Sequence, residues 1–209
     1  MHAPPTTHAR AAAPARAMDR RSAGSGWYAP HVIVFHIAVT TVDDYATKRE
    51  PYRREHMGRL QGLRANSILI GGGPSPDGRR ADLFYRLQQP WQVKPAMEED
   101  PYWTGGVWTK YTPRSFSHFV EPWEMVPIVL DGSRVATIVE GPVGDLDMAQ
   151  ISLIEMRGAG KLAFGGILED GQTLVVMKTA DPEEAKAALG EHGFWDPATL
   201  TTRPFLWVI

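Results

Sequence analysis

Short apolar runs alternate with helical stripes from residue 31 to the end of the chain. Residues 31–39, HVIVFHIAV, are almost all apolar and rich in β-branched and aromatic side chains, which predicts a buried strand. Residues 50–63 instead carry apolar side chains at helical spacing. The same patterns predict further elements at 67–70 (strand), 81–87 (strand), 91–99 (helix), 100–104 (helical turn) and 105–120 (strand). The first part of the chain therefore reads βαββαβ.

The same order returns in the second part of the chain. Strands are predicted at 134–143, 161–164, 173–178 and 203–209, with helices at 146–156 and from residue 181. Three landmarks recur: Gly71-Gly72 after 94 residues, Asp77-Gly78 after 93, and Tyr102-Trp103, as Phe194-Trp195, after 92. A nearly constant offset indicates an internal repeat, so we predict two tandem units of about 95 residues.

The predicted elements define a fold class. A βαββαβ unit places two helices on one face of a four-stranded antiparallel sheet, as in ferredoxin-like folds, and leaves the other face uncovered. We therefore predict an α+β protein whose two ferredoxin-like units pack sheet on sheet in an α/β-barrel-type pairing. The predicted parts are a disordered tail at 1–28, a first domain at 29–125 and a second at 126–209. The alternative is that each half pairs with its counterpart in a second chain, as a homo-oligomer.

Composition narrows the class of protein. A net charge of −2 and a pI near 6.4 give no basic field, so we expect no nucleic-acid partner. The chain has no cysteine and no apolar run of the ~20 residues that span a bilayer, so we expect neither thiolate chemistry nor a membrane partner. Arg20-Arg21 is followed by no hydrophobic stretch, which argues against an export signal. The expected location is the cytoplasm.

The predicted helix at 50–63 carries a candidate catalytic residue, His56. At about 100° per residue, Tyr52, His56, Leu60 and Leu63 share one stripe, so the imidazole points towards whatever the helix packs on. The ordinary alternative is a core histidine whose two nitrogens find hydrogen-bond partners. The seven histidines show no His-x-Glu-x-x-His or similar spacing, so we expect no metal site.

A set of short motifs between residues 31 and 121 resembles the YCII-related (YciI-like) family of dimeric α/β-barrel proteins. In chain order, the matching residues are Arg53-x-x-His56 with Leu60 and Leu63, Gly72-Gly73-Pro74, Asp77-Gly78, Asp100-Pro101-Tyr102 and Gly106-Val107. In that family a histidine and an aspartate form a proposed catalytic dyad, so the resemblance implies this role for His56 and Asp100. Members include a dehydrochlorinase acting on a chlorinated hydroxyhydroquinone, and related barrels include muconolactone isomerase. Residues 134–209 match the same plan more weakly.

The chemistry of these residues supports the implied pair. A carboxylate beside an imidazole fixes its tautomer and favours its protonated form, which makes His56 a usable base near neutral pH. A glycine run after a strand presents N–H groups to a developing oxyanion, with a tight turn or a bulge as the alternative interpretation. The predicted substrate-binding residues are Tyr52, Arg53, Gly72, Gly73, Tyr102 and Trp103.

The second unit differs at both dyad positions. By these offsets, His56 corresponds to Gln150 and Asp100 to His192, so we expect one competent site per chain. The favoured function is a cofactor-independent, lyase- or isomerase-like enzyme. It would transfer a proton during elimination, isomerisation or cyclisation of a small cyclic or phenolic substrate. The alternative is a non-catalytic small-ligand-binding or accessory protein that retains the barrel.

Overall fold

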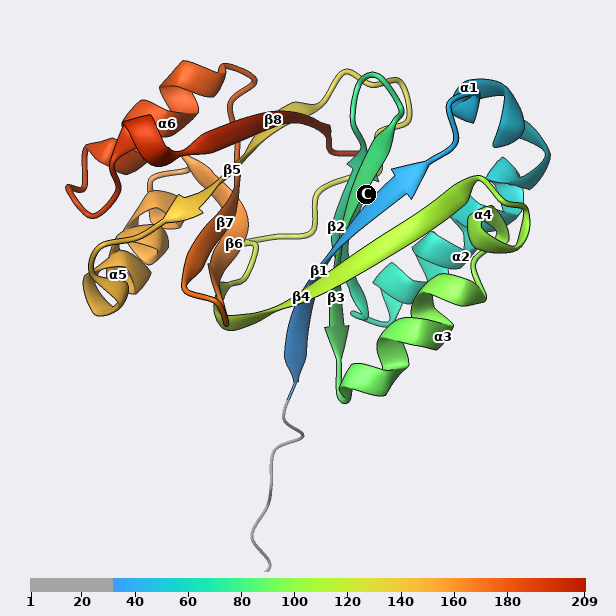
Figure 1. Cartoon of the computed structure of the whole chain (residues 1–209), viewed down its shortest axis with the longest axis horizontal. Coiled ribbons are helices and arrows are strands. Elements are labelled where there is room, and N and C mark those ends of the chain that lie inside the picture. Colours follow the sequence, from blue (N-terminus) through green and yellow to red (C-terminus); the bar gives the residue numbers. More distant parts are fainter. Residues whose placement is uncertain (1–31) are drawn as a thin grey trace, which may run out of the picture.

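The computed structural model describes residues 32–209, so the predicted tail at 1–28 lies outside the described residues. Within them, one antiparallel sheet has the strand order β2-β3-β1-β4-β6-β7-β5-β8 (Figure 1). The strands are β1 (Ile33–Thr41), β2 (Leu69–Pro74), β3 (Arg80–Leu87), β4 (Trp108–Val120), β5 (Val135–Pro142), β6 (Leu162–Leu168), β7 (Gln172–Met177) and β8 (Thr201–Leu206). The helices are α1 (Tyr45–Lys48), α2 (Arg53–Ala65), α3 (Val93–Glu98), α4 (Pro101–Thr104), α5 (Leu146–Gly158) and α6 (Pro182–Gly190), with short 3₁₀ helices at Glu50–Tyr52, Pro90–Gln92 and Pro197–Thr199. The predicted α+β class is confirmed.

The two halves of the sheet have the same internal order. It is β2-β3-β1-β4 in the first half and β6-β7-β5-β8 in the second. Helices α2, α3 and α4 cover the outer face of the first half, and α5 and α6 cover that of the second (Figure 1). The shared order agrees with the predicted repeat. An origin by duplication, and the domain boundary between residues 125 and 126, stay predictions.

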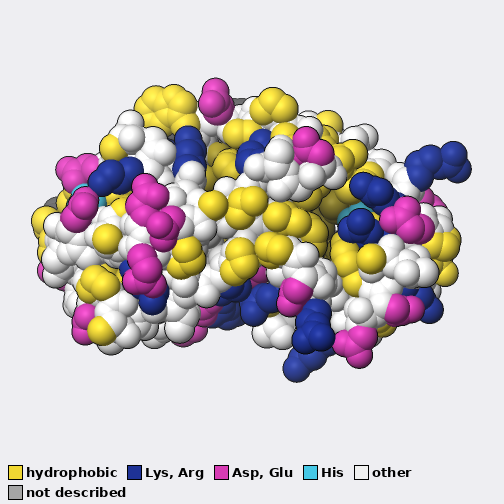
Figure 2. Space-filling view, turned by 90° about the horizontal axis from the view of Figure 1, so that it is seen from above, with side chains coloured by type: hydrophobic (Ala, Val, Ile, Leu, Met, Phe, Trp, Pro, Cys, Tyr) yellow, Lys and Arg dark blue, Asp and Glu magenta, His cyan; other side chains and the backbone are white. Residues whose placement is uncertain are grey.

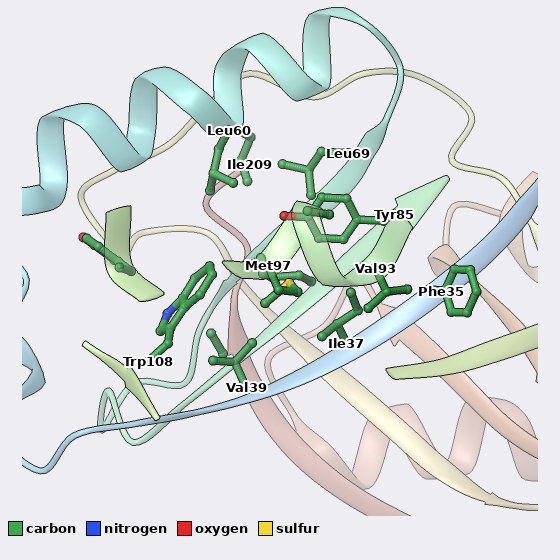
Figure 3. Close-up of a cluster of buried hydrophobic side chains, with 14 of the residues drawn as sticks. Phe35, Ile37, Val39, Leu60, Leu69, Tyr85, Val93, Met97, Trp108 and Ile209 are labelled. Atoms are coloured by element: carbon green, nitrogen blue, oxygen red, sulfur yellow. The ribbon is translucent and has the colours of Figure 1, made fainter. Parts of the chain in front are cut away.

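Strands β1, β3, β6 and β7 are buried on both faces because both faces are covered. On β1, Ile37 packs beneath the helices in a core that includes Leu60 (Figure 3). Val34 points to the opposite face and belongs to a core shared by the two halves. In that shared core the rings of Phe84 and Phe164 lie 4.9 Å apart between centroids. The inner faces of the two half-sheets therefore pack on one another.

The two half-sheets also join at their edges, so the units that were predicted to pack sheet on sheet share one continuous sheet. The end of β4 pairs with β6 in one seam. In the other seam, Gly72 donates to the carbonyl of Ile209 (2.8 Å) and accepts from its N–H (3.1 Å). Because the 13-residue β4 outreaches its partner β1, its free backbone groups are available to β6. The result is a barrel rather than a two-sheet sandwich.

The glycine run that was expected to follow a strand lies inside β2. A Cβ atom on Gly73 would collide with the carbonyl of Leu206, and one on Gly166 with the carbonyl of His118. Each glycine therefore permits close backbone approach at one of the two seams. A register shift just before Gly71 supports the bulge interpretation of this run.

Candidate active site

Helix α2 places His56 against Asp100. The face of α2 that carries His56 and Leu60 is buried, and His56 is 6% exposed. Asp100 is fully buried as the N-cap of α4, with Pro101 at the first helical position. Its Oδ1 lies 2.7 Å from Nδ1 of His56 and accepts from the backbone N–H of Tyr102 at 2.9 Å. One capping carboxylate thus also holds the imidazole.

The contacts of His56 fix its tautomer and its ring plane. Since an ionised carboxylate only accepts, Nδ1 carries the proton, and Nε2 of the neutral ring keeps its lone pair. The imidazole stacks on Tyr102 with 3.7 Å between centroids and an angle of 11°, and Trp108 meets it edge-on at 5.3 Å. His56 is therefore oriented on three sides.

A cavity of about 240 Å³ opens beside His56 and is built from both halves of the chain. Viewed from above, Figure 2 shows hydrophobic side chains in a hollow with a histidine and basic side chains beside it. The lining residues are Tyr45, Arg49, Arg53, His56, Met57, Leu60, Gly72, Gly73, Pro74, Ala81, Leu83, Tyr102, Trp108, Leu130, Asp131, Gly132, Leu206, Val208 and Ile209. Apolar walls with a few charged groups are typical of small-molecule sites.

The charged part of the cavity is mainly cationic. Arg49 and Arg53 both line it, and each lies near the same exposed carboxylate, that of Glu50, at 3.4 and 3.8 Å. Two guanidinium groups share one carboxylate, so this side suits an anionic ligand group. Burial raises the pKa of Tyr102, which keeps its hydroxyl protonated near neutral pH.

Some of the predicted binding residues reach this cavity and others do not. Arg53, Gly73 and Tyr102 line it. Gly72 lines it too, but its N–H is bound to the carbonyl of Ile209, so its predicted role as an oxyanion donor is wrong. Tyr52 and Trp103 are outside the lining: the ring of Tyr52 packs against Gly105, and that of Trp103 against Tyr111.

Sequence reasoning missed other parts of the lining. Arg49 stands four residues before Arg53, and this spacing was an available signal. Leu130–Gly132 and the chain after β8 carried no local signal, because only barrel closure brings them to α2.

A second buried histidine–aspartate pair lies inside the barrel. Nε2 of His36 is 2.7 Å from Oδ1 of Asp82, which is also 3.0 Å from Arg203 of the second half. Burial lowers the pKa of His36, which favours the neutral ring. Neither residue lines the cavity, so this pair serves to join the halves.

Residues 32–209 contain no group of three or more His, Asp or Glu side chains placed to hold a metal ion. Among the same residues, no helix has the length and apolar character needed to cross a bilayer.

Comparisons with known proteins identify the fold. No protein-family model matches the chain, and no curated protein matches it. Its structure is similar to a proposed monooxygenase from Lactobacillus acidophilus NCFM, at 13% identity over 86% of this chain and 95% of that one, with a TM-score of 0.54. A second proposed monooxygenase, from Fusobacterium nucleatum subsp. nucleatum ATCC 25586, gives 5% identity, coverages of 85% and 93%, and a TM-score of 0.51. The chain therefore shares its α+β barrel fold with these two proteins.

A third neighbour is shorter. 5-Chloro-2-hydroxyhydroquinone dehydrochlorinase from Burkholderia phenoliruptrix AC1100 aligns over 41% of this chain and 94% of its own, at 19% identity and a TM-score of 0.37. The resemblance to YciI-like proteins is not confirmed by these comparisons, and a homo-oligomer stays a prediction.

Proposed function

We propose that the chain is an enzyme that transfers a proton on a small cyclic or phenolic substrate, with His56 as general base or acid and Asp100 as its orienting partner. One observation carries this proposal: Nδ1 of His56 is held 2.7 Å from a fully buried carboxylate at the side of a cavity of about 240 Å³. A histidine in this setting presents Nε2 to a ligand in a defined tautomer.

The proposed reaction uses the charges and walls of the cavity. Arg49 and Arg53 bind the carboxylate or phenolate of the substrate, and its ring lies against Leu60 and Trp108. Nε2 of His56 takes a proton from carbon, and Asp100 stabilises the imidazolium that forms. Returning the proton at another position completes an isomerisation or a cyclisation. In an elimination the leaving group departs with its electron pair, and the proton passes to solvent.

The alternative function is a non-catalytic ligand-binding or accessory protein. The pair His56–Asp100 would then be a structural hydrogen bond, since Asp100 already caps α4 through Tyr102. This alternative predicts that ligands bind the cavity without being converted.

The test is a panel of monocyclic compounds: chlorinated hydroquinones, hydroxybenzoates and unsaturated lactone acids. Binding is measured as a rise in Tm, and conversion by NMR and by halide release. We expect anionic rings to raise Tm, Arg53→Met to reduce that rise, and conversion to require His56. Binding by anionic rings with no conversion of any compound supports the alternative. Oxygen consumption during turnover would instead support the monooxygenase chemistry named for two structural neighbours.

A further inference from the structure

Three buried polar atoms near the dyad have no hydrogen-bond partner in the described part of the chain. They are Oδ2 of Asp100, Nε of Arg59 and the hydroxyl of Tyr85. Buried polar groups left unpaired are costly, so each requires an explanation. Arg59 Nε lies 3.8 Å from Asp100 Oδ2. Burial, and then the charge of Asp100, raise the pKa of Tyr85.

Helix α2 aims two side chains at the same carboxylate. His56 and Arg59 are three residues apart and therefore share a helix face. His56 contacts Oδ1 of Asp100, while Arg59 approaches Oδ2. The guanidinium of Arg59 is anchored by the carbonyls of Pro95 and Ala96, at 3.2 and 3.3 Å. Its Nε is thus directed at Asp100 from a fixed position.

The separation between Arg59 and Asp100 suits a bridged contact. A distance of 3.8 Å is too long for a direct hydrogen bond. Buried water molecules typically have about three polar partners, and three orphaned groups are present here. Tyr85 is fully buried in the layer between the sheet and α2, the helix that carries Leu60 (Figure 3).

We propose that Arg59 and Tyr85 are positioning residues that hold Oδ2 of Asp100 through one buried water and thereby set the basicity of His56. Arg59 competes with the imidazolium for the charge of Asp100, and a donor hydroxyl withdraws charge from the same oxygen. Without Arg59 or the Tyr85 hydroxyl, more of the negative charge of Asp100 acts on His56, which favours the protonated imidazole. The catalytic consequence rests on the proposed function, but the coupling itself does not.

The test is an NMR titration of the His56 ring in the full chain without ligand. Arg59→Met is expected to move the titration of the His56 ring to higher pH than in the wild-type protein, because a nearby positive charge is removed, and Tyr85→Phe is expected to move it by less. Matched controls are Arg54→Met, an exposed arginine on the same helix, and Tyr111→Phe, whose hydroxyl bonds Glu98. The ionisable groups that face this cluster are Asp100, Tyr102, Arg59, Tyr85, Tyr45, Arg49, Arg53 and Asp131, with Glu99 3.6 Å from Arg59 and Glu50 beside Arg49 and Arg53.

Two results would overturn the proposal. One is a His56 pKa in both variants equal to that in the two controls. The other is a higher Tm for Tyr85→Phe, because removing an unpaired buried hydroxyl stabilises a protein whereas removing a bonded one destabilises it. If Arg59→Met does not fold, the Tyr85→Phe titration and its Tm decide alone. If the two variants shift the His56 titration as expected but no compound is turned over, the proposed function is wrong and this inference still holds.

Discussion

The two halves of the barrel use the space beneath their first long helix differently. Helices α2 and α5 each have 13 residues, and the fourth residue is His56 in α2 and Ala149 in α5. Both are buried, but His56 lines a cavity, while Ala149 belongs to an apolar core with Leu153 and Trp195. The same backbone plan therefore supports a polar site in one half and a packed core in the other.

The caps before the last strand of each half show the same contrast. Asp100 and Asp196 each precede a proline and accept from the N–H two residues later, at 2.9 and 3.0 Å. Asp100 is buried against His56, whereas Asp196 is exposed. The order of elements thus pairs the dyad with Ala149 and Asp196, not with Gln150 and His192 as the sequence offsets indicated. A common cap becomes half of a dyad when one helix residue is a histidine.

The largest expected effect separates the halves by activity. His56→Ala is expected to lower turnover by about 10²–10⁴-fold, the usual contribution of a positioned acid or base. The controls are Gln150→Ala and His192→Ala, at the second-half positions that the sequence offsets had matched to the dyad, and both should retain wild-type turnover. Steady-state kinetics on a converted compound measures this. Equal losses in the three variants would end the distinction between the halves.

A second prediction tests the charges that join the halves. Burial raises the pKa of Glu140, but hydrogen bonds from Arg114 and Arg203 outweigh this and hold it at about 2. Because its pKa is depressed, the Glu140 carboxylate stabilises the fold at pH values above its ordinary pKa of 4.5. This contribution is lost as the pH falls towards 2. For a pKa shift of this size, the loss in the free energy of unfolding is about 3 kcal/mol.

Protonation of His36 also destabilises the fold as the pH falls. Its pKa is lowered by burial, so protonation below its ordinary value of 6.5 also opposes folding. We expect Tm to fall from pH 7 to pH 3, and Glu140→Gln to weaken that dependence. The control is Glu191→Gln, which removes an exposed pair with Lys161 in the second half. A Tm profile unaffected by Glu140→Gln would show that this network does not couple the halves.

Substituting the glycine at either seam should destabilise the protein by a similar amount. Gly73→Ala and Gly166→Ala each place a Cβ against a backbone carbonyl of the facing strand or its edge. Overpacking of this kind costs about 1–3 kcal/mol in the free energy of unfolding. Gly58→Ala, on open α2 surface, should instead stabilise by about 0.5–1 kcal/mol. Urea denaturation measures all three, and a neutral result at one seam would show that it opens easily.

The smaller of the two expected effects on turnover separates the two caps. Asparagine is also a good N-cap, so Asp100→Asn keeps the cap and removes only the charge facing His56. A loss of turnover of about 10–100-fold is expected, as for outer partners of other functional histidines, which is smaller than the loss expected for His56→Ala. Asp196→Asn should change neither turnover nor Tm. Full activity of Asp100→Asn would mean that the carboxylate does not orient the imidazole.

The parts of the site that could be predicted from the sequence are those encoded by neighbouring residues. The stripe that carries His56 and the Asp100-Pro101 cap are both encoded within a few residues. Only the family resemblance indicated that His56 and Asp100 act as a pair. The glycine run left two interpretations open because the group that requires Gly73, the carbonyl of Leu206, comes from the far end of the chain. The pair His36–Asp82 was missed because it depends on the register of β1 with β3. A histidine inside an apolar strand was the available hint.

Deuterium exchange in D₂O tests the central claim most directly, because it detects proton transfer even when no product accumulates. An NMR time course with a compound that binds the cavity should show exchange of one carbon-bound hydrogen by the wild-type protein. His56→Ala should slow that exchange by at least about 100-fold, while His192→Ala should leave it unchanged. Exchange at the same rate in wild type and His56→Ala would contradict the account.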